Sequence, residues 1–534
     1  MRWVLKLVAT ISALTVVHGQ APQALQTTVQ TKSGPVRGTG TDIVMFKGIP
    51  YAAPPTGDRR WRPPAPPKPW TAVRNAAQFG PQCPQPGNFA PRIRGASPQV
   101  APPSSEDCLT LNVWTPAKSG SERLPVMVWI HGGGFTIGSG SGARNTGEML
   151  ASRGAVVVTL NYRLGALGFL AHPGLSRESD RRVSGNYGLL DQIAALRWVR
   201  ANIEAFGGNP ANVTLFGQSA GASSGFALMV SPLARGLFHR VIAQSASTTV
   251  TVGPKPRLRT SYYGLPPAET AGESMAPDIR KLRAMSADEV VAKLPISPTF
   301  STGWRYGPVI DGYVLPDDTG VLLGTSSQAK VPLLIGHNAD EAFFYRSSAH
   351  QTISGYRDFV RALFPPELVD TVLTRYPAAE DAQASEAVLR MFTDFRFVTP
   401  TVLTARAASK VTDVYMYRFS RVSPLNKSTF GGAGHGTEIP YVFGHLTADE
   451  SQYEEVDRTM SRAMAGAWVQ FAKTGNPNGA SLPQWPAYTA PEYRLLDYGD
   501  EIAIRSNADS PNVDFFQRVF ETMRTQRSIP TAAK

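Results

Sequence analysis

Long apolar runs, internal repeats and cysteines are all scarce in this 534-residue chain. Beyond the N-terminus, no stretch approaches the roughly 20 consecutive apolar residues that cross a bilayer as a helix, so we expect no membrane span. The absence of heptads and of any period of about 20 to 50 residues excludes coiled coils and solenoids. The chain has only two cysteines, too few for a cysteine-rich metal cluster, and we expect neither a metal nor a cofactor.

Acidic residues are also few relative to basic ones. The chain has 41 Asp and Glu against 53 Lys and Arg, a formal net charge of +12. Such an excess can serve binding to nucleic acid or to anionic surfaces. The basic residues are scattered, however, and no basic run is interleaved with aromatic residues. We therefore expect a solvated basic surface and no nucleic-acid partner.

The N-terminus carries an apolar run at 7–17, preceded by Arg2 and Lys6 and followed by the small residue Gly19. This order is typical of a secretory signal peptide that is cleaved after the small residue. An uncleaved anchor is the alternative, but the run is well short of a bilayer span. The sequence thus predicts a signal peptide over 1–19 and a secreted or periplasmic protein.

The two cysteines, Cys83 and Cys108, lie close together in the sequence. In an exported protein such a pair is most simply one disulfide that closes a surface loop. Two buried free thiols are the alternative, which export to an oxidising compartment disfavours.

Short, nearly continuous apolar runs that are rich in β-branched residues recur along the chain. They lie at 125–130, 155–160, 213–216, 331–335 and 414–417. Runs of this length fit strands that are buried on both faces. Between the second and third runs, apolar residues at 187–206 recur at helical spacing. The alternation predicts an α/β fold with a mainly parallel sheet and helices on both faces.

A Gly-x-Ser-x-Gly motif at 217–221 follows the predicted strand 213–216 directly. In a nucleophile elbow the strand turns so tightly into a helix that flanking Cβ atoms would collide, and the serine adopts a strained conformation that exposes its Oγ. Residues 221–225 match the same pattern. No strand precedes that second match, which would lie inside the helix. We therefore predict Ser219 as the nucleophile and Ser223 as a non-catalytic residue.

A second glycine-rich segment, His-Gly-Gly-Gly-Phe at 131–135, follows the predicted strand 125–130. Glycines let the backbone approach a reacting carbonyl and aim N–H groups at its developing oxyanion. A plain glycine-rich turn is the alternative. The segment 131–135 lies after a predicted strand and upstream of the elbow, which favours the catalytic interpretation. The two motifs together predict a serine hydrolase.

With these motifs the sequence resembles the type-B carboxylesterase family, the cholinesterase-like esterases, and in particular its bacterial para-nitrobenzyl-esterase-like members. The resemblance runs from about Gln30 to about Gln517. Its matching segments are FKGIPYA at 46–52, EDCLTLN at 106–112, NYRLGALGF at 161–169, NYGLLDQ at 186–192 and FGGNP at 206–210. It implies an α/β-hydrolase fold with long loop and helical insertions, and a single catalytic domain over 20–534.

The resemblance also implies the partners of Ser219. The family's acid is a glutamate in an Asn-x-Asp-Glu segment after a strand, which 338–341 matches with Glu341. The neighbouring Asp340 is then a structural carboxylate.

The family's base lies in a Gly-x-x-His-Gly-x-Glu segment, matched by 432–438, which implies His435. The chain order of nucleophile, acid and base requires a histidine beyond Glu341. Of the two others there, His350 lacks the glycine setting and His445 follows a Phe-Gly pair, where packing is the default.

The same resemblance implies oxyanion donors at the backbone N–H groups of Gly133, Gly134 and Ala220, and a disulfide from Cys83 to Cys108 beside the active-site mouth. It implies hydrolysis of small-molecule carboxylic esters through an acyl-enzyme. Family members that serve only adhesion have a broken triad, whereas this one is intact. Hydrolysis of amides, carbamates or lactones and the oligomeric state stay open.

The chain departs from the family in two places that bear on substrate charge. Most relatives have a glutamate before the nucleophile, where this chain has Gln218. The segment 83–108 lacks the tryptophan that choline-specific members stack on the quaternary ammonium. It contains Arg92 and Arg94 instead, which would favour anionic esters if the loop borders the mouth. Two solvated surface arginines are the alternative.

Overall fold

The computed structural model describes residues 27–86, 103–142, 145–246, 255–262, 265–294, 306–345, 351–429, 431–447, 449, 451–479, 482–490, 492–506 and 510–527. The predicted signal peptide, Arg92, Arg94 and His350 lie outside these described residues.

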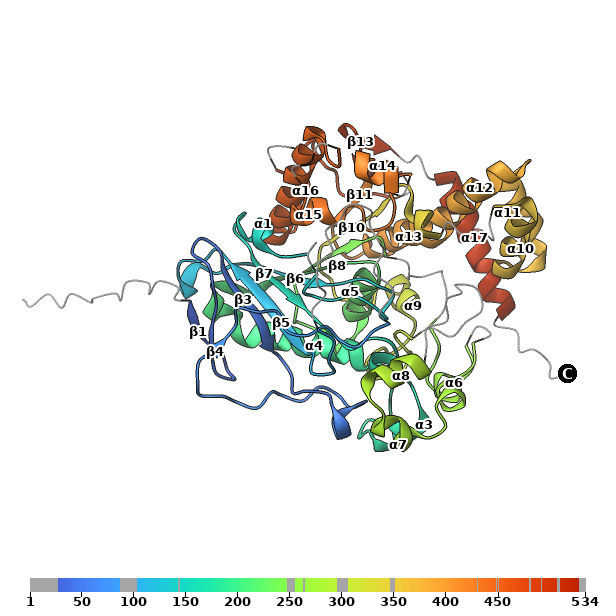
Figure 1. Cartoon of the computed structure of the whole chain (residues 1–534). Coiled ribbons are helices and arrows are strands. Elements are labelled where there is room, and N and C mark those ends of the chain that lie inside the picture. The colour runs from blue at the N-terminus through green and yellow to red at the C-terminus, as the bar shows by residue number, and fades with distance from the viewer. Residues whose placement is uncertain are drawn as a thin grey trace, which may run out of the picture.

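A ten-stranded sheet runs through the molecule in the order β13-β12-β11-β10-β9-β8-β6-β7-β5-β3 (Figure 1). Its strands are β3 (Val44–Pro50), β5 (Thr110–Thr115), β6 (Leu124–Ile130), β7 (Val156–Leu160), β8 (Gly208–Gln218), β9 (Arg240–Gln244), β10 (Leu333–Asn338), β11 (Val414–Phe419), β12 (Arg494–Tyr498) and β13 (Ile502–Ser506). All pairs from β7 to β12 are parallel. The pairs at both edges are antiparallel. The predicted mainly parallel sheet is confirmed.

The helices of the described residues cover both faces of this sheet and fill the insertions between its strands. They are α1 (Glu148–Ala151), α2 (Gly165–Phe169), α3 (Pro173–Glu178), α4 (Tyr187–Asn202), α5 (Ala220–Val230), α6 (Ala268–Met275), α7 (Ile279–Ala284), α8 (Ala287–Lys293), α9 (Thr319–Gly324), α10 (Ile353–Leu363), α11 (Pro366–Arg375), α12 (Asp381–Thr393), α13 (Thr399–Ala408), α14 (Pro424–Thr429), α15 (Ile439–Phe443), α16 (Glu455–Thr474) and α17 (Ser510–Arg527). A π-helical turn, η7 (Asp394–Val398), joins α12 to α13.

Alternate side chains of the central strands enter two separate cores. Val126, Val128 and Ile130 of β6 pack in the core that contains α4 and α5. Met127 and Trp129, the residues between them, pack in the core that contains α15 and α16. This alternation with both faces buried explains why the strand reads as an unbroken apolar run.

Two insertions interrupt the sheet, as the resemblance implied. Helices α6 to α8 lie between β9 and β10, and α10 to α13 lie between β10 and β11. Figure 1 shows α10, α11, α12 and α17 gathered at one side of the molecule.

Across the part of the chain that the structure describes, no helix combines the length and the apolar character that crossing a membrane requires. A separate three-stranded sheet, β1-β2-β4, is formed by β1 (Thr28–Gln30), β2 (Pro35–Arg37) and β4 (Arg74–Asn75).

Candidate active site

The predicted site residues follow the carboxyl ends of parallel strands. Ser219 comes directly after β8, the glycine-rich segment 131–134 after β6, and Glu341 shortly after β10. Because β6, β8 and β10 run in the same direction, their carboxyl ends lie along one edge of the sheet. Ligands of open α/β sheets bind outside this edge.

Ser219 has the strained backbone of an elbow. Its φ is +56° and its ψ is −119°, at the junction of β8 and α5, and its N–H donates to the carbonyl of Gln244 at 2.9 Å. A Cβ at Gly221 would lie 1.9 Å from the carbonyl oxygen of Ile130, and one at Gly217 would lie 2.7 Å from that of the same residue. Both glycines are therefore required by contact, and Ser219 stays partly exposed.

Ser223, which shares the sequence pattern, lies inside α5, as predicted. It is 3% exposed. Its buried Oγ has no hydrogen-bond partner among the described residues. One helical turn thus separates an accessible serine from one that is packed away.

His435 and Glu341 meet in a short contact. Nδ1 of His435 lies 2.5 Å from Oε2 of Glu341, and Glu341 is fully buried. Its other oxygen accepts the backbone N–H of Asn338 at 2.8 Å. With both carboxylate oxygens engaged, Glu341 fixes the imidazole tautomer in which Nδ1 carries the proton. The remaining nitrogen, Nε2, lies 3.1 Å from the side-chain nitrogen of Gln218, the residue before Ser219.

Asp340 and His445 have structural surroundings. Asp340 accepts the N–H of Ala433 at 2.8 Å, so it holds the segment that precedes His435. Nε2 of His445 lies 3.0 Å from Oγ1 of Thr146. Its ring stacks on Phe443 at 6.4 Å between centroids. These contacts agree with the structural roles expected from sequence.

The glycine-rich segment 131–134, here called the oxyanion segment, lies against the elbow. A Cβ at Gly132 would lie 3.1 Å from Cβ of Ser219, and Gly133 has a φ of +104°. The carbonyl of Gly133 accepts the N–H groups of Thr136 and Ile137 at 3.0 and 3.1 Å, which fixes the turn. Among the described residues, the N–H groups of Gly133 and Gly134 have no hydrogen-bond acceptor. Ala220 is the first residue of α5, so its N–H has no partner within the helix.

His131 begins the same segment and is buried at 5% exposure. Its Nδ1 lies 2.8 Å from the carbonyl of Gly132, and its ring stacks on Tyr162 with centroids 4.5 Å apart. Its Nε2 is buried without a partner among the described residues. Burial lowers the pKa of His131 to about 4. His131 is therefore neutral near pH 7 and orients Gly132.

A second buried carboxyl lies behind the first. Glu438 accepts Nδ2 of Asn338 at 2.7 Å and Nε2 of Gln244 at 3.2 Å. Burial and then the negative charge of Glu341 raise the pKa of Glu438. The shift favours the neutral form of Glu438, which reduces the negative charge buried beside Glu341.

Sequence reasoning missed three neighbours of this centre. Gln244 and Asn338 bind Glu438 as described, and the ring of Phe397 from η7 lies 5.0 Å from the imidazole of His435. Asn338 is the first residue of the Asn-x-Asp-Glu segment, so the sequence motif could have indicated its place in the site. Gln244 and Phe397 belong to no motif, and only the fold brings them to His435 and Glu438.

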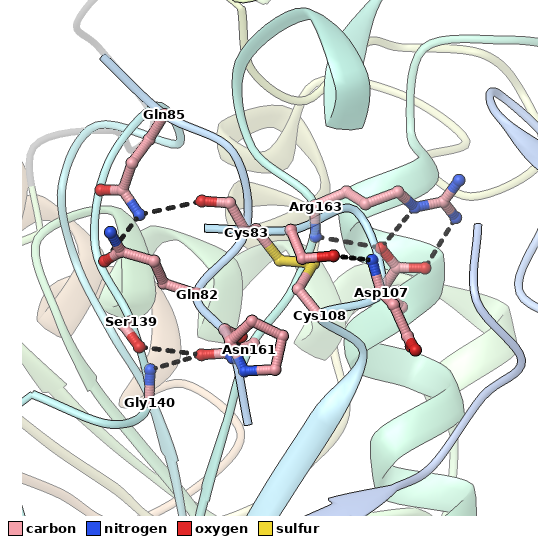
Figure 2. Close-up of a disulfide and its surroundings, with 12 residues drawn as sticks. Gln82, Cys83, Gln85, Asp107, Cys108, Ser139, Gly140, Asn161 and Arg163 are labelled. Carbon is pink, nitrogen blue, oxygen red and sulfur yellow. Dashed lines mark hydrogen bonds and ion pairs between the residues drawn. A yellow bond between two sulfur atoms is a disulfide. The ribbon is translucent and has the colours of Figure 1, made fainter. Parts of the chain in front are cut away.

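Cys83 and Cys108 form the predicted disulfide (Figure 2). Beside it, Nε2 of Gln85 donates to the carbonyl of Gly138 at 3.0 Å, and Oε1 of Gln85 accepts the N–H of Gly138 at 2.8 Å. Asn161 accepts the N–H of Gly140 at 2.8 Å. Through Gln85, the chain next to Cys83 is thus joined to Gly138, which follows the oxyanion segment.

Within the described ranges, no three His, Cys, Asp or Glu side chains are arranged to hold a metal ion.

Comparisons with known proteins agree with this geometry. A sequence profile of the carboxylesterase family matches residues 25–516. Fumonisin B1 esterase of Sphingopyxis macrogoltabida is 41% identical over 487 residues, which cover 88% of this chain and 86% of that protein. Para-nitrobenzyl esterase of Bacillus subtilis is 37% identical over 501 residues, covering 90% and 96%. A solved PNB esterase structure has a TM-score of 0.77 and 33% identity, covering 92% of this chain and 100% of that one.

Proposed function

Because this chain belongs to the carboxylesterase family and is a carboxylic ester hydrolase, we propose that it is a secreted serine esterase whose reaction uses Ser219, His435 and Glu341. The observation that carries the proposal is the 2.5 Å contact between His435 and Glu341. This pair lies beside the elbow, since Nε2 of His435 contacts Gln218, the residue before Ser219.

In acylation, Nε2 of His435 takes the proton of Ser219 as Oγ attacks the ester carbonyl carbon. Glu341 keeps the imidazole oriented and stabilises the imidazolium that forms. The N–H groups of Gly133, Gly134 and Ala220 stabilise the oxyanion, each donor typically contributing about 10²–10³ in rate. The tetrahedral intermediate then expels the alcohol, which takes the proton from His435 and leaves an acyl-enzyme.

Deacylation repeats these steps with water as the nucleophile. His435 removes a proton from water as the oxygen attacks the acyl carbon, and the same donors stabilise the second oxyanion. Collapse breaks the bond to Oγ, and Ser219 regains its proton from His435. The carboxylic acid leaves and the enzyme returns to its starting state.

The proposal places a cleaved signal peptide at 1–19 and a single catalytic domain at 20–534, in a protein that is periplasmic or extracellular. The family profile begins only at residue 25, and its match continues to 516. A disulfide between Cys83 and Cys108 suits an oxidising compartment. These observations support the proposal, which N-terminal sequencing of the exported protein tests.

For the substrate we propose small-molecule esters, with a preference for anionic ones. Gln218 puts a neutral amide beside the elbow, and the chain carries a net charge of +12. The relatives' names supply two starting points for a screen, fumonisin B1 and para-nitrobenzyl esters.

The decisive test compares Ser219→Ala with Ser223→Ala. Loss of the nucleophile lowers kcat by about 10⁶-fold in a well-studied serine protease, and we expect a loss of at least about 10⁴-fold in Ser219→Ala. Ser223→Ala should keep most of the activity, because its Oγ is buried in α5. A fluorophosphonate probe should label the wild type and Ser223→Ala only. Equal losses in two folded variants would refute the assignment.

A further inference from the structure

Gln218, the last residue of β8, fills the space between the oxyanion segment and the imidazole. Its Nε2 lies 3.1 Å from Nε2 of His435, and the residue is 5% exposed. A Cβ at Gly132 would lie 2.8 Å from its Oε1, and a Cβ at Gly436 would lie 3.7 Å from its Nε2. The absence of side chains at Gly132 and Gly436 thus leaves room for this amide next to His435.

The positions of the protons at this contact follow from the hydrogen bond that Glu341 makes on the other side of the imidazole ring. Because Nδ1 of the neutral imidazole donates to Glu341, Nε2 carries a lone pair. The side-chain N–H of Gln218 donates into that lone pair. An imidazolium has N–H groups on both nitrogens, so two donors would face each other here. The amide in this orientation stabilises the neutral imidazole.

We infer that Gln218 is a positioning residue that holds His435 in its neutral, proton-accepting form and extends ester hydrolysis to lower pH than a carboxylate at 218 would allow. This inference rests on the proposed function, since it acts through His435 as the base. In the reaction the same lone pair takes the proton of Ser219, so the N–H of Gln218 gives up this hydrogen bond to the serine hydroxyl before the transfer and does not itself carry the proton.

Other charged groups lie on the elements that pack against His435. Glu341 contacts Nδ1, Glu438 lies behind Glu341, and Asp340 binds Ala433. From the π-helical turn η7, Phe397 contacts the ring, and the charged residues Asp394 and Arg396 belong to the same turn. Asp394 accepts the hydroxyl of Tyr376. The group that β8 places at Nε2 of His435 is the neutral amide of Gln218. Substitution of Gln218 by glutamate therefore changes the charge at Nε2 and leaves the other charged groups in place.

The test measures kcat/KM for a neutral ester across about pH 5 to 9 in the wild type, Gln218→Met and Gln218→Glu. Methionine keeps the size of the side chain and removes the donor, whereas glutamate adds an acceptor and a negative charge. We expect the midpoint of the acidic limb to be lowest in the wild type, higher in Gln218→Met and highest in Gln218→Glu. A negative charge this close favours a protonated partner by about 1–3 pH units, so Gln218→Glu should shift by at least about one unit.

A residue that only packs would change the plateau of the profile and leave its midpoint in place. Identical midpoints in the wild type and Gln218→Met, or an unmoved midpoint in Gln218→Glu, would overturn the inference. For a variant with slow turnover, the pH dependence of phosphonylation by a fluorophosphonate gives the same midpoint in a single covalent event, and thermal unfolding checks the fold. Ser219→Ala separates the two claims, because labelling or hydrolysis in that variant refutes the proposed function whatever Gln218 does.

Discussion

Two glycine-rich segments, 131–134 and 432–436, each bring a histidine to the surroundings of Ser219, and the two rings have opposite environments. Nδ1 of His435 contacts the carboxylate of Glu341, whereas Nδ1 of His131 contacts a backbone carbonyl. The second nitrogen of His435 has the amide of Gln218, whereas that of His131 has no partner among the described residues. The carboxylate, more than the glycine setting, separates a candidate base from a structural histidine.

The largest expected effect comes from removing that carboxylate. In Glu341→Gln the amide no longer stabilises an imidazolium and can select the wrong tautomer, a change that costs about 10⁴-fold in kcat in a serine protease triad. We expect a loss of about 10³–10⁴-fold, measured as kcat on a neutral ester.

The matched control is Asp340→Asn, which makes the same exchange one residue earlier. Asp340 binds the N–H of Ala433, and an asparagine oxygen can still accept that bond. We expect this variant to keep most of its activity. A loss as large as that of Glu341→Gln would mean that the comparison of the two histidines has identified the wrong carboxylate.

The second prediction concerns His131 and the pH dependence of stability. Its pKa in the folded protein is about 4, below the ordinary value of about 6.5. Between these values the unfolded chain binds a proton that the folded chain does not, so the free energy of unfolding falls as the pH falls. The contribution of His131 is complete above about pH 6.5, and about 3 kcal/mol of it is lost by pH 4.

Comparison with His131→Asn isolates this contribution from other titrating groups. Glu438 acts in the opposite sense: its raised pKa stabilises the fold most at low pH, and this stability is lost as the pH rises through the folded-state pKa. Urea unfolding at neutral and acidic pH should show the stability gap between wild type and His131→Asn shrink by about 3 kcal/mol on acidification. A gap that is constant with pH would contradict a buried neutral His131.

The third prediction tests whether the segment 131–134 aligns the nucleophile. A Cβ at Gly132 would lie 2.8 Å from the carbonyl oxygen of Gln218 and 3.1 Å from Cβ of Ser219. Gly132→Ala should therefore displace the elbow, and a displacement of about 1 Å can cost about 10²-fold in rate. We expect that loss in kcat, with the protein still folded by circular dichroism.

Gly324→Ala is the control, since a Cβ at the end of α9 would meet nothing within 4 Å. It should leave kcat unchanged. Full activity in Gly132→Ala would show that the oxyanion segment and the elbow adjust to each other freely.

Much of this site could be predicted because its parts are local. The strand before each motif reads as an apolar run, as in β6 and β8, and the elbow glycines stand within five residues of each other, although the carbonyl oxygen that requires them belongs to Ile130 of β6. The strand β9 was missed, because it is short and begins and ends with Arg240 and Gln244. Edge strands such as β3 were missed as well, since with alternating burial they do not form an apolar run.

The contacts that tune the site could not be predicted, because they join distant parts of the chain. Gln218 and His435 are 217 positions apart, and Asn338 and Glu438 are 100 apart. Each pair depends on the order of the strands in the sheet, which a family resemblance implies only in outline. The motif showed that Gln218 is neutral, whereas its contact with the imidazole required the fold.

The smallest expected effect concerns substrate charge. Near Nε2 of His435 the neutral Gln218 supplies no attraction for a cation, so any preference must come from other charges. The sequence offers Arg92 and Arg94 as candidates, which are outside the described residues. Exposed charges are screened over about 8 to 10 Å at physiological salt, so we expect a preference of only a few-fold for a carboxylate ester over its trimethylammonium counterpart, shrinking as salt rises.

The measurement is kcat/KM for matched esters in the wild type, in Arg92→Ala/Arg94→Ala and in the control Arg197→Ala/Arg200→Ala. The exposed arginines of the control lie toward the end of α4 that precedes β8, on the side of the sheet opposite its carboxyl edge. The first pair should lower the preference and the control pair should not. Equal effects would attribute the preference to net charge alone, and a wild type that favours the cation would show that a neutral Gln218 does not decide the sign.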